Sequence, residues 1–531
     1  MTLQDDKSSH VPESPGLGWR THIARIALIA AFAGLLLGWL ALHTDILFAD
    51  GLRYVARAQS LDRGENAEAL KKAVDHPLYP IAITIVHRWI GGTGPDAWQA
   101  AAQLASALAG ILLIPPLYLV NRELFGDRIA LPASLLVFAV PLTGHVFADT
   151  LSESTFLLFW LIGLWAALRF FKTGRLAWLL PLVVGSVLAY LTRPEGLLLP
   201  VATLATLGLS PFRVLGGLGK RGVVILGISV IGVVACVGPY VVHKGGIGTK
   251  PSVARLLGKA PQSAPHAVER QKPLDPGQTL TKTYGLAAKS VAKAVADAVT
   301  WPLMIFAGVG LMSIRPRDGE ARQWRLLAVI VAASLLALVR LHATGGYCTP
   351  RHAMILSMLI VPAAAFGIGR VIDFLVSKVS IGRRRVVMTA CWAMVPLVFV
   401  LMQGRAAISP INDGLGGYRD AGRWLTEQRC DVAKVVDVTG WSQFYSGRTG
   451  YTFEDLIAAP GDPLARWVVV REAHLKGPWE YCGRLRSLVE GHSPVMVFQG
   501  DSGPRKTRVL VFDRASLQST RGAGREDLMR R

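Results

Sequence analysis

The feature that most constrains this chain is a series of long apolar runs separated by short polar segments. An α-helix needs about 20 apolar residues to cross the hydrocarbon core of a bilayer. Eleven runs approach that length. The sequence therefore predicts an α-helical, polytopic membrane protein with about eleven transmembrane helices. The runs cover residues 26–44, 97–120, 129–148, 151–168, 176–192, 196–212, 222–243, 298–314, 326–346, 353–372 and 386–404.

The composition agrees with a membrane protein that also has a part in water. Hydrophobic residues make up 51% of the 531 residues and charged residues 18%. This balance is more apolar than that of a soluble protein and more polar than that of a purely membrane-embedded one. The net charge of +21 is spread over short loops rather than gathered on one soluble basic face. We therefore expect no nucleic-acid partner.

The positive charges also predict which way the chain crosses the membrane. Residues 77–92 are apolar but short, and either span or lie on the surface as an amphipathic helix. If they do not span, five loops on the side of the N-terminus carry 16 Lys and Arg residues together. Because Lys and Arg are enriched in cytoplasmic loops, we expect residues 77–92 on the outer surface and the N-terminus in the cytoplasm. The five loops are 121–128, 169–175, 213–221, 315–325 and 378–385.

This topology divides the chain into a membrane domain and an extracytoplasmic tail. The tail alternates helix-like and strand-like patterns, such as the strand-like RWVVVR at 466–471, and is long enough for its own core. We therefore expect a small C-terminal extracytoplasmic α/β domain in a protein of the cytoplasmic (inner) membrane. Cys430 and Cys482 lie in this domain, either paired or unpaired. The expected boundaries are a disordered cytoplasmic N-terminus 1–21, a membrane domain 22–404 with outer loops 44–97 and 244–296, the α/β domain 405–516 and a disordered tail 517–531.

Unusual polar groups collect on the expected outer face. Charges near membrane depth are costly, so they tend to mark a functional site. Four loops from separate parts of the chain contribute them, which is a more specific signal than any single residue. They include Asp50, Asp75 and His76 of the first loop, Asp149 and Glu153 of GHVFADTLSES, Arg193 and Glu195 of LTRPEG, and Tyr347 and Arg351 of RLHATGGYCTPRH.

The order of these features resembles the glycosyltransferase-C superfamily, in particular its protein O-mannosyltransferase and aminoarabinose transferase group. Enzymes of that group have an acidic residue just after the first span, and Asp50-Gly-Leu-Arg-Tyr54 of this chain resembles that motif. They then have a Pro-rich segment, which HPLYP at 76–80 resembles. The later turns ADTLSE, LTRPEG and YCTPRH and the tail motif FYSGR at 444–448 are also similar. Two positions depart from the group. Ala49 replaces the first of two adjacent acids, and His76 replaces a Lys. The departures concern the substrate more than the reaction.

The resemblance implies a membrane glycosyltransferase that moves one sugar from a polyprenyl-phosphate donor to an acceptor hydroxyl on a glycan, lipid or protein. We expect Asp50 to accept the hydroxyl proton in a direct, inverting attack. Arg193 and Arg351, assisted by His76, would stabilise the leaving phosphate. The simpler interpretations are that Asp50 caps a helix starting near Leu52, and that the arginines contact lipid headgroups.

Four further residues have two interpretations each. Asp149 and Glu153 are four residues apart, so on a helix they share a face. They either orient the acceptor or hold a divalent ion, and the simpler alternative is that they start a helix. Tyr54 and Tyr347 contact the sugar or, more commonly for such residues, pack at the membrane interface.

We expect no required metal or other cofactor, because arginines can neutralise a monophosphate leaving group. A diphosphate donor would instead favour Mg²⁺ or Mn²⁺ near Asp50 and Asp149. The alternative functions are a lipid or solute transporter (a flippase) and a non-catalytic membrane subunit. A transporter would favour charges near the membrane midplane and paired repeats, and the sequence has neither.

Overall fold

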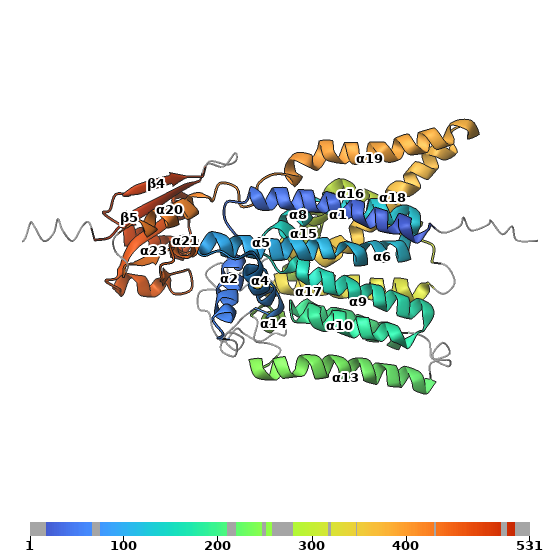
Figure 1. The fold of residues 1–531 in the computed structure, drawn as a ribbon, viewed down its shortest axis with the longest axis horizontal. Coiled ribbons are helices and arrows are strands. Elements are labelled where there is room, and N and C mark those ends of the chain that lie inside the picture. The colour runs from blue at the N-terminus through green and yellow to red at the C-terminus, as the bar shows by residue number, and fades with distance from the viewer. Residues whose placement is uncertain are drawn as a thin grey trace, which may run out of the picture.

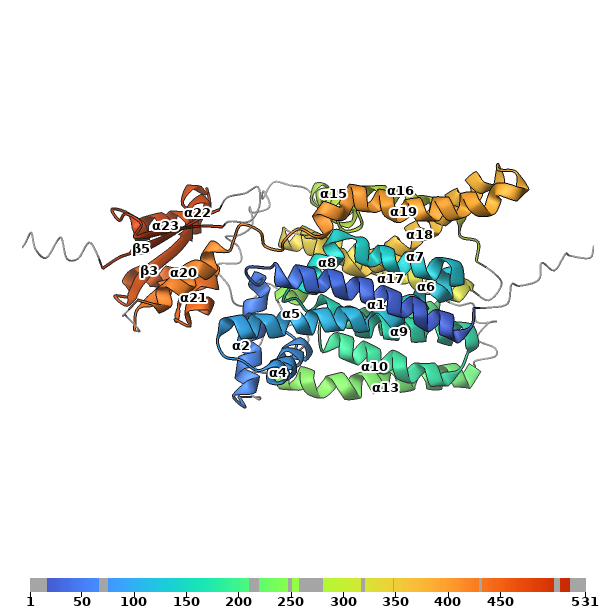
Figure 2. The same ribbon diagram turned by 45° about the horizontal axis from the view of Figure 1, so that its top comes forward.

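A helical bundle and a smaller C-terminal sheet domain make up this protein, and the sheet domain lies beyond one end of the bundle (Figure 1). The long helices of the bundle run roughly alongside one another, as the turned view also shows (Figure 2). The computed structural model describes residues 17–65, 75–209, 219–246, 251–256, 280–316, 320–346, 348–428, 432–500 and 507–515. The expected disordered ends therefore fall largely outside the described residues.

The helices of the bundle follow the apolar runs of the sequence. The first half contains α1 (Trp19–Leu42), α2 (Ala49–Asp62), α4 (Leu78–Ile90), α5 (Pro95–Leu112), α6 (Ile114–Phe125), α7 (Asp127–Ala139), α8 (Pro141–Ala148), α9 (Glu153–Thr173), η1 (Leu176–Trp178), α10 (Leu179–Tyr190), η2 (Pro194–Leu197) and α11 (Leu198–Gly208). The second half contains α13 (Gly219–Lys244), α14 (Pro251–Leu256), α15 (Leu280–Val299), α16 (Trp301–Ser313), α17 (Ala321–Gly345), η4 (Pro350–Ala353), α18 (Met354–Ser377), η5 (Ile381–Arg383) and α19 (Arg384–Ala407).

The helices identify a multi-pass membrane protein, although the expected count of eleven spans is not confirmed. Within the described residues, six helices are long and apolar enough to cross a membrane, or up to eight if each of two bent pairs is one span. The pairs are α7 with α8, bent by 66°, and α15 with α16, bent by 97°. The α10 and α11 helices have 12 and 11 residues. Each is therefore about 18 Å long or less, which is shorter than a hydrocarbon core of about 30 Å.

Close packing between helices depends on small side chains. A Cβ atom added to Gly310 of α16 would lie 2.1 Å from the carbonyl oxygen of Ala363 on α18. A Cβ atom added to Gly367 of α18 would lie 1.9 Å from the carbonyl oxygen of Phe306 on α16. Both contacts are far inside van der Waals distance, so the two backbones approach this closely only because the glycines lack side chains. This is a common packing mode of membrane helices.

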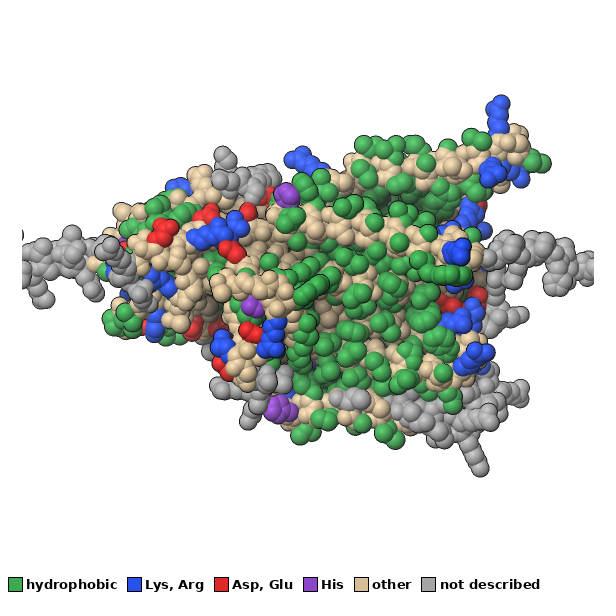
Figure 3. Space-filling model, in the orientation of Figure 1, with side chains coloured by type: hydrophobic (Ala, Val, Ile, Leu, Met, Phe, Trp, Pro, Cys, Tyr) green, Lys and Arg blue, Asp and Glu red, His purple; other side chains and the backbone are tan. Residues whose placement is uncertain are grey.

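The two ends of the bundle differ in charge. Hydrophobic side chains cover its middle, and Lys and Arg side chains gather at the end away from the sheet domain (Figure 3). We call this the basic end. Here Arg25 of α1 donates to the Asp127 carbonyl oxygen at 2.5 Å, and Arg169 of α9 donates to Glu123 of α6 at 3.2 Å. The start of α1 therefore lies with the loops that carry the expected positive charge.

The opposite end, which we call the domain end, carries α2 and α4. Both helices lie across this end of the bundle rather than along it (Figure 2). The α4 helix covers most of residues 77–92 with only 13 residues, and it is not among the helices long enough to span. The 78–90 segment therefore does not cross the bundle, as the charge pattern predicts.

The C-terminal domain is a five-stranded sheet flanked by helices, which confirms the expected small α/β domain. Its strand order is β2-β1-β3-β5-β4, with β1 parallel to β2 and β3, and β5 antiparallel to β3 and β4. The central β3 is RWVVVR with a preceding alanine, and its run of buried valines suits a strand covered on both faces. The elements are α20 (Gly417–Thr426), β1 (Lys434–Val436), α21 (Trp441–Ser446), β2 (Gly450–Tyr451), η6 (Leu456–Gly461), β3 (Ala465–Arg471), α22 (Glu472–Lys476), α23 (Glu480–Val489), β4 (Met496–Gln499) and β5 (Arg508–Asp513).

Candidate active site

The α2 helix places Asp50 at the domain end of the bundle. The helix begins at Ala49, and its N-cap residue Phe48 makes no side-chain capping hydrogen bond. Asp50 lies in the first helical turn, where the partial positive charge of the helix N-terminus favours a carboxylate. Asp50 is therefore not the capping residue of a helix starting near Leu52, which corrects the simpler interpretation of this residue.

Asp50 is held between two arginines. One carboxylate oxygen accepts a hydrogen bond from Arg351, which comes from η4, and the other lies 3.1 Å from Arg53 Nη2. Arg53 also donates from Nε to Asp75 at 3.0 Å. The guanidinium of Arg351 stacks over the Phe48 ring, with 4.7 Å between the guanidinium carbon and the ring centroid. The Asp50 side chain is 23% exposed, so it remains open to a substrate.

A second group of ion pairs lies beside Asp50. Arg193 Nη1 is 2.8 Å from Glu153 Oε1, and Arg193 Nη2 is 3.0 Å from Glu195 Oε1. The two arginines meet at Glu153, because Arg351 Nη1 is 3.9 Å from the same Oε1 atom. Burial alone lowers the pKa of Arg193, but Glu195 and Glu153 more than offset this and raise it. Arg193 therefore stays charged, and it is only 13% exposed.

Tyr54 and His76 are buried side chains of the same end of the bundle. Tyr54 is buried on α2, and its hydroxyl is 3.2 Å from Ser152 Oγ. Burial raises the pKa of Tyr54, so it is a neutral hydrogen-bonding group. The His76 ring lies edge-on to Tyr190, with centroids 4.9 Å apart, and 5.7 Å from the Tyr240 ring. Both residues are therefore buried and contact groups of the bundle.

Asp149 is placed differently from the other candidates. It is 1% exposed, and its Oδ1 atom accepts hydrogen bonds from the backbone N–H groups of Phe48 at 3.0 Å and Thr150 at 2.7 Å. Its Oδ2 atom accepts from Asn412 Nδ2 at 3.1 Å. A Cβ atom added to Gly51 would lie 1.9 Å from Thr150 Oγ1, so the turn after Asp149 packs directly against α2. Asp149 thus lies beneath α2 and connects it to the C-terminal segment.

The structure therefore brings most of the predicted site residues together, with two exceptions. Asp50, Glu153, Arg193 and Arg351 form one connected set of ion pairs. Asp149 lies behind α2, and Tyr347 is outside the described residues. Among the described residues, no group of three or more His, Cys, Asp or Glu side chains is arranged to hold a metal ion.

Sequence reasoning missed three residues of this region. Arg53 is three residues after Asp50, a spacing that places both on one helix face, so the sequence did contain this signal. Lys244 and Tyr240 are four residues apart at the end of α13, and Lys244 Nζ donates to the Tyr240 hydroxyl at 3.1 Å. Lys244 is only 9% exposed. It was not identified because a lysine at the end of an apolar run resembles an ordinary interfacial residue.

A groove of about 300 Å³ opens beside the ion pairs. Its polar end is formed by Tyr190, Glu195 and His352. Its remaining wall is mostly apolar and comes from η2, α17 and α18, including Ala337 and Leu338. Clefts of about 300–1,000 Å³ are typical of small-molecule sites, and this one combines a polar end with a mostly apolar wall.

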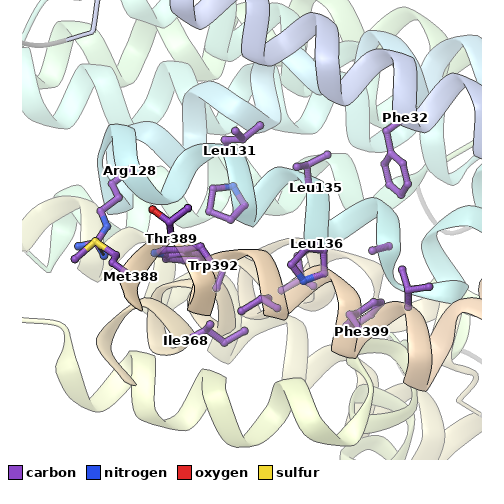
Figure 4. Close-up of a pocket in the computed structure, with 16 residues that line it drawn as sticks. Phe32, Arg128, Leu131, Leu135, Leu136, Ile368, Met388, Thr389, Trp392 and Phe399 are labelled. Carbon is purple, nitrogen blue, oxygen red and sulfur yellow. Dashed lines mark hydrogen bonds between the residues drawn. The ribbon is translucent and has the colours of Figure 1, made fainter. Parts of the chain in front are cut away.

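A larger groove, of about 630 Å³, contains none of the candidate residues. It lies between α7 and α19, with Phe32 of α1 at one end and Arg128 at the other (Figure 4). Its wall is almost entirely apolar, including Trp392 and Phe399. Arg128 is ion-paired with Asp373 at 2.8 Å. The groove therefore lacks the converging acids and bases that surround Asp50.

Comparisons with known proteins concern the fold of the chain. Residues 75–242 match the family model of dolichyl-phosphate-mannose-protein mannosyltransferases. No curated protein sequence matches the chain. Among solved structures, ArnT from Cupriavidus metallidurans bound to undecaprenyl phosphate is 12% identical, with a TM-score of 0.54, and the alignment covers 93% of this chain and 98% of ArnT.

The oligosaccharyltransferase AglB from Archaeoglobus fulgidus gives a similar result. Its complex with an inhibitory peptide and a dolichol-phosphate is 12% identical, with a TM-score of 0.56, over 86% of this chain and 70% of AglB. An oligosaccharyltransferase from the same archaeon, tethered to an acceptor peptide, gives a TM-score of 0.57 at 12% identity, over 91% of this chain and 74% of that one. At such low identity the likeness concerns the fold. The chain is therefore a multi-pass membrane protein with the glycosyltransferase-C fold, similar to the mannosyltransferases and aminoarabinose transferases of that superfamily.

Proposed function

We propose that this protein is a membrane glycosyltransferase that moves a sugar from a polyprenyl-phosphate donor to an acceptor hydroxyl, with inversion at the anomeric carbon. The observation that carries the proposal is the position of Asp50. Its carboxylate lies between Arg351 and Arg53, beside the Glu153–Arg193 pair and next to a groove with an apolar interior. One base, several cations and an apolar groove are the parts that this reaction needs.

Asp50 is the proposed general base. The acceptor oxygen attacks the anomeric carbon and its proton passes to Asp50, while the bond between that carbon and the phosphate oxygen breaks. Both carboxylate oxygens of Asp50 contact arginines, but each has a second lone pair that can accept the proton. A single carboxylate with room for the acceptor fits one direct displacement rather than a covalent intermediate.

Arg193 and Arg351 are the proposed groups for the leaving phosphate, with His76 assisting. The phosphate departs with the electron pair of the broken bond, and fixed cations offset the charge that develops. The two guanidiniums already share Glu153, so they lie within reach of one small anion. Glu153 balances their charge while no phosphate is present. Tyr54 and Tyr347 are proposed to contact the sugar.

The groove beside Glu195 and His352 is the proposed position of the donor lipid. A polyprenyl chain is apolar, which matches the mostly apolar wall of the groove. Its phosphate would lie at the polar end, where Arg193 pairs with Glu195 at 3.0 Å. The ArnT structure holds undecaprenyl phosphate and the AglB structure a dolichol-phosphate, so the fold accommodates lipids of this class. The required chemistry uses only side chains of this chain, so we propose no obligatory metal.

We also propose how the protein is oriented. The positive charge at the basic end supports a cytoplasmic position for that end and for the N-terminus. The domain end, the ion pairs around Asp50 and residues 405–516 then lie on the extracytoplasmic face of the inner membrane. The acceptor is a glycan, lipid or protein hydroxyl that reaches Asp50 from that side.

The test is transfer by the purified full-length protein in proteoliposomes. It is offered polyprenyl-phosphate sugars together with glycan, lipid and peptide acceptors, and the anomeric configuration of the product is determined by NMR. The wild type should give an inverted product, and Asp50→Asn should lower kcat by about 10²–10⁴-fold. Asp62→Asn is the matched control, because Asp62 lies on the same helix and pairs with Arg88 at 2.7 Å. It should stay within about twofold of the wild type.

Three outcomes would overturn the proposal. A wild type that transfers no sugar from any of these donors rules out the enzyme, and movement of donor lipid between leaflets without transfer identifies a flippase. A retained anomeric configuration rules out the direct displacement. Full activity in Asp50→Asn removes this residue as the base.

A further inference from the structure

We propose that the C-terminal domain holds the catalytic base in place, through a clamp on residues 45–48 formed by Asn412, Trp441 and Tyr445. Residues 45–48 lie directly before α2 and form neither helix nor strand. The clamp residues would be positioning residues, since they act on Asp50 through the backbone that leads to it. This inference rests on the proposed function, and the experiment below separates the two.

The carbonyl groups of this segment are bound by side chains far away in the sequence. Buried backbone groups need hydrogen-bond partners, and this segment has no secondary structure to supply them. Asn412 Nδ2 donates to the Ile46 carbonyl oxygen at 3.0 Å, and Trp441 Nε1 donates to the Leu47 carbonyl oxygen at 2.9 Å. The C-terminal part of the chain therefore replaces the partners that a helix or sheet would provide.

The N–H groups of the segment are bound in the same way. The Leu47 N–H donates to the Tyr445 hydroxyl at 3.3 Å, and that hydroxyl in turn donates to Gln99 of α5. The Phe48 N–H donates to Asp149 Oδ1 at 3.0 Å. Asp149 Oδ2 accepts from Asn412, the same side chain that binds Ile46. Asn412 and Asp149 thus join three segments at the start of α2.

Side-chain packing reinforces the clamp. Ile46 is fully buried in the hydrophobic core of the C-terminal domain, together with Tyr418, Trp441 and Val469. Gly440 follows β1 with a φ of 79°. A Cβ atom added to Gly440 would lie 3.5 Å from Leu52 Cδ1 of α2, so the domain packs closely against this helix.

The position of the contact on the sheet is also informative. In an open α/β sheet, the carboxyl ends of parallel strands form the usual ligand-binding edge. Here Gly440 and Trp441 lie in the connection that follows β1, at the start of α21, and the neighbours of β1, β2 and β3, are both parallel to it. The segment before α2 occupies this edge. The C-terminal domain therefore binds residues 45–48 at the edge where such a domain would otherwise bind a ligand.

The clamp ends two residues before Asp50. Phe48, whose ring lies under the Arg351 guanidinium, is the N-cap of α2 and has no capping hydrogen bond from its own side chain. The position of the first helical turn therefore depends on the groups that bind residues 46–48. Because a misplacement of about 1 Å can cost about 10²-fold in rate, loosening the clamp should slow the chemical step.

The experiment uses Trp441→Phe, Tyr445→Phe and Asn412→Ala in the full-length protein in proteoliposomes. Each variant should lower kcat by about 10–100-fold while the KM for the donor stays within about twofold, since the donor groove is not touched. Arg466→Gln is the control. It breaks the 2.7 Å pair with Asp513 inside the same domain but none of the hydrogen bonds to residues 45–48, and should leave kcat unchanged.

Hydrogen–deuterium exchange gives a readout that does not depend on transfer. The three clamp variants should speed exchange in residues 46–62 relative to the wild type, and Arg466→Gln should not. Equal losses of kcat in Arg466→Gln, or wild-type kcat and exchange in all three clamp variants, would overturn the clamp. A wild type without transferase activity defeats the proposed function instead, and the exchange rates then decide the clamp by themselves.

Discussion

The two ends of the bundle contain similar ion pairs, which differ in how their cations are shared between carboxylates. At the basic end, Glu123 lies between Lys172 at 2.6 Å and Arg169 at 3.2 Å. At the domain end, Glu153 lies between Arg193 at 2.8 Å and Arg351 at 3.9 Å. Both carboxylates are buried, with 9% and 3% of the side chain exposed. A buried carboxylate with two cations therefore does not mark an active site by itself.

What differs is how the cations are shared. Each arginine next to Glu153 also binds a further carboxylate, Glu195 or Asp50. At the basic end the two cations are 32% and 46% exposed, and a nearby Gln323 side chain donates to the Leu168 carbonyl oxygen at 3.0 Å. The basic-end ion pairs connect the end of α6 with the end of α9. Among the described residues, the domain end combines shared cations with an accessible acid and an adjoining groove, and the basic end does not.

The largest expected effect comes from removing Arg193. Arg193→Met leaves Glu153 and Glu195 without their main cation, and breaking a buried pair costs about 3–5 kcal/mol. The matched variant at the basic end is Arg169→Met. Glu123 keeps Lys172 there, so the expected loss is about 1 kcal/mol or less. In thermal unfolding experiments in detergent micelles, Arg193→Met should therefore unfold at a clearly lower temperature than Arg169→Met.

Equal loss of stability in the two variants would contradict this view of the bundle. It would mean that the pairs at both ends contribute alike. Sugar transfer measured on the same preparations adds a second contrast, because Arg193→Met should be inactive where it is still folded. Arg169→Met should retain activity.

Asp149 predicts a dependence of stability on pH that arises at the domain end. It lies directly after α8, and burial raises its pKa from 3.8 to about 6, although hydrogen bonds from Thr150 and Phe48 oppose this. A raised pKa means that folding favours the protonated form. The stabilisation is therefore full below pH 3.8 and is lost as the pH rises through about 6, by about 3 kcal/mol at most.

The measurement is the change in unfolding temperature between pH 4 and pH 7. Asp149→Asn cannot titrate at this position, so its unfolding temperature should fall less over this range than that of the wild type. Asp127→Asn at the basic end removes a carboxylate paired with Arg122 at 2.6 Å and serves as the control. A wild-type pH profile in Asp149→Asn would exclude the proposed titration.

Sequence patterns predicted the parts of this structure that depend on local physics. Backbone groups in lipid must be satisfied within the segment, so each long apolar run became a helix. The count of spans was not confirmed. Among the described helices, α10 and α11 are shorter than their apolar runs suggested. In the C-terminal domain the strand-like RWVVVR forms most of the central β3. Its continuous run of apolar residues matches a strand that is buried on both faces.

The contacts of the candidate site could not be predicted in this way. Asp50 and Arg351 are 301 residues apart, and no periodicity relates them. Their meeting depends on how α2 and η4 pack at the domain end. Asp149 looked like a substrate ligand because it faces the same loops, and only the packing of α2 against Thr150 shows that it lies behind that helix. Arg53 was within reach of sequence reasoning, through its spacing from Asp50.

The next effect tests the shape of a cation rather than its charge. Arg351→Lys keeps the positive charge but loses the fork that reaches Asp50, and it loses the stacking over Phe48. Removing one donor that stabilises developing charge costs about 10²–10³-fold in kcat. Because lysine retains one donor, we expect the lower limit of about 10²-fold in steady-state assays.

The equivalent change at the basic end is Arg128→Lys. Arg128 pairs with Asp373 and lies over the Trp392 ring at 6.0 Å, so it makes contacts of the same kinds. Its replacement should leave kcat within about twofold of the wild type. A tenfold loss there would show that the assay reports general damage to the bundle rather than the chemistry at Asp50.

The smallest expected effect compares the two grooves. Ala337→Trp places a large ring in the groove beside Glu195, and Ala139→Trp does the same in the larger groove near Trp392. Overpacking costs about 1–3 kcal/mol at either position, so the two variants are matched in stability. The first should raise the donor KM about tenfold, because the ring occupies space proposed for the lipid chain, and the second should leave it unchanged.

Lengthening the donor series from a short to a full polyprenyl chain sharpens the comparison. The penalty in Ala337→Trp should grow with chain length only while the added units lie inside the groove. If Ala139→Trp shows that length dependence instead, the donor lies in the larger groove, and the polar end of the groove beside Glu195 must serve the acceptor.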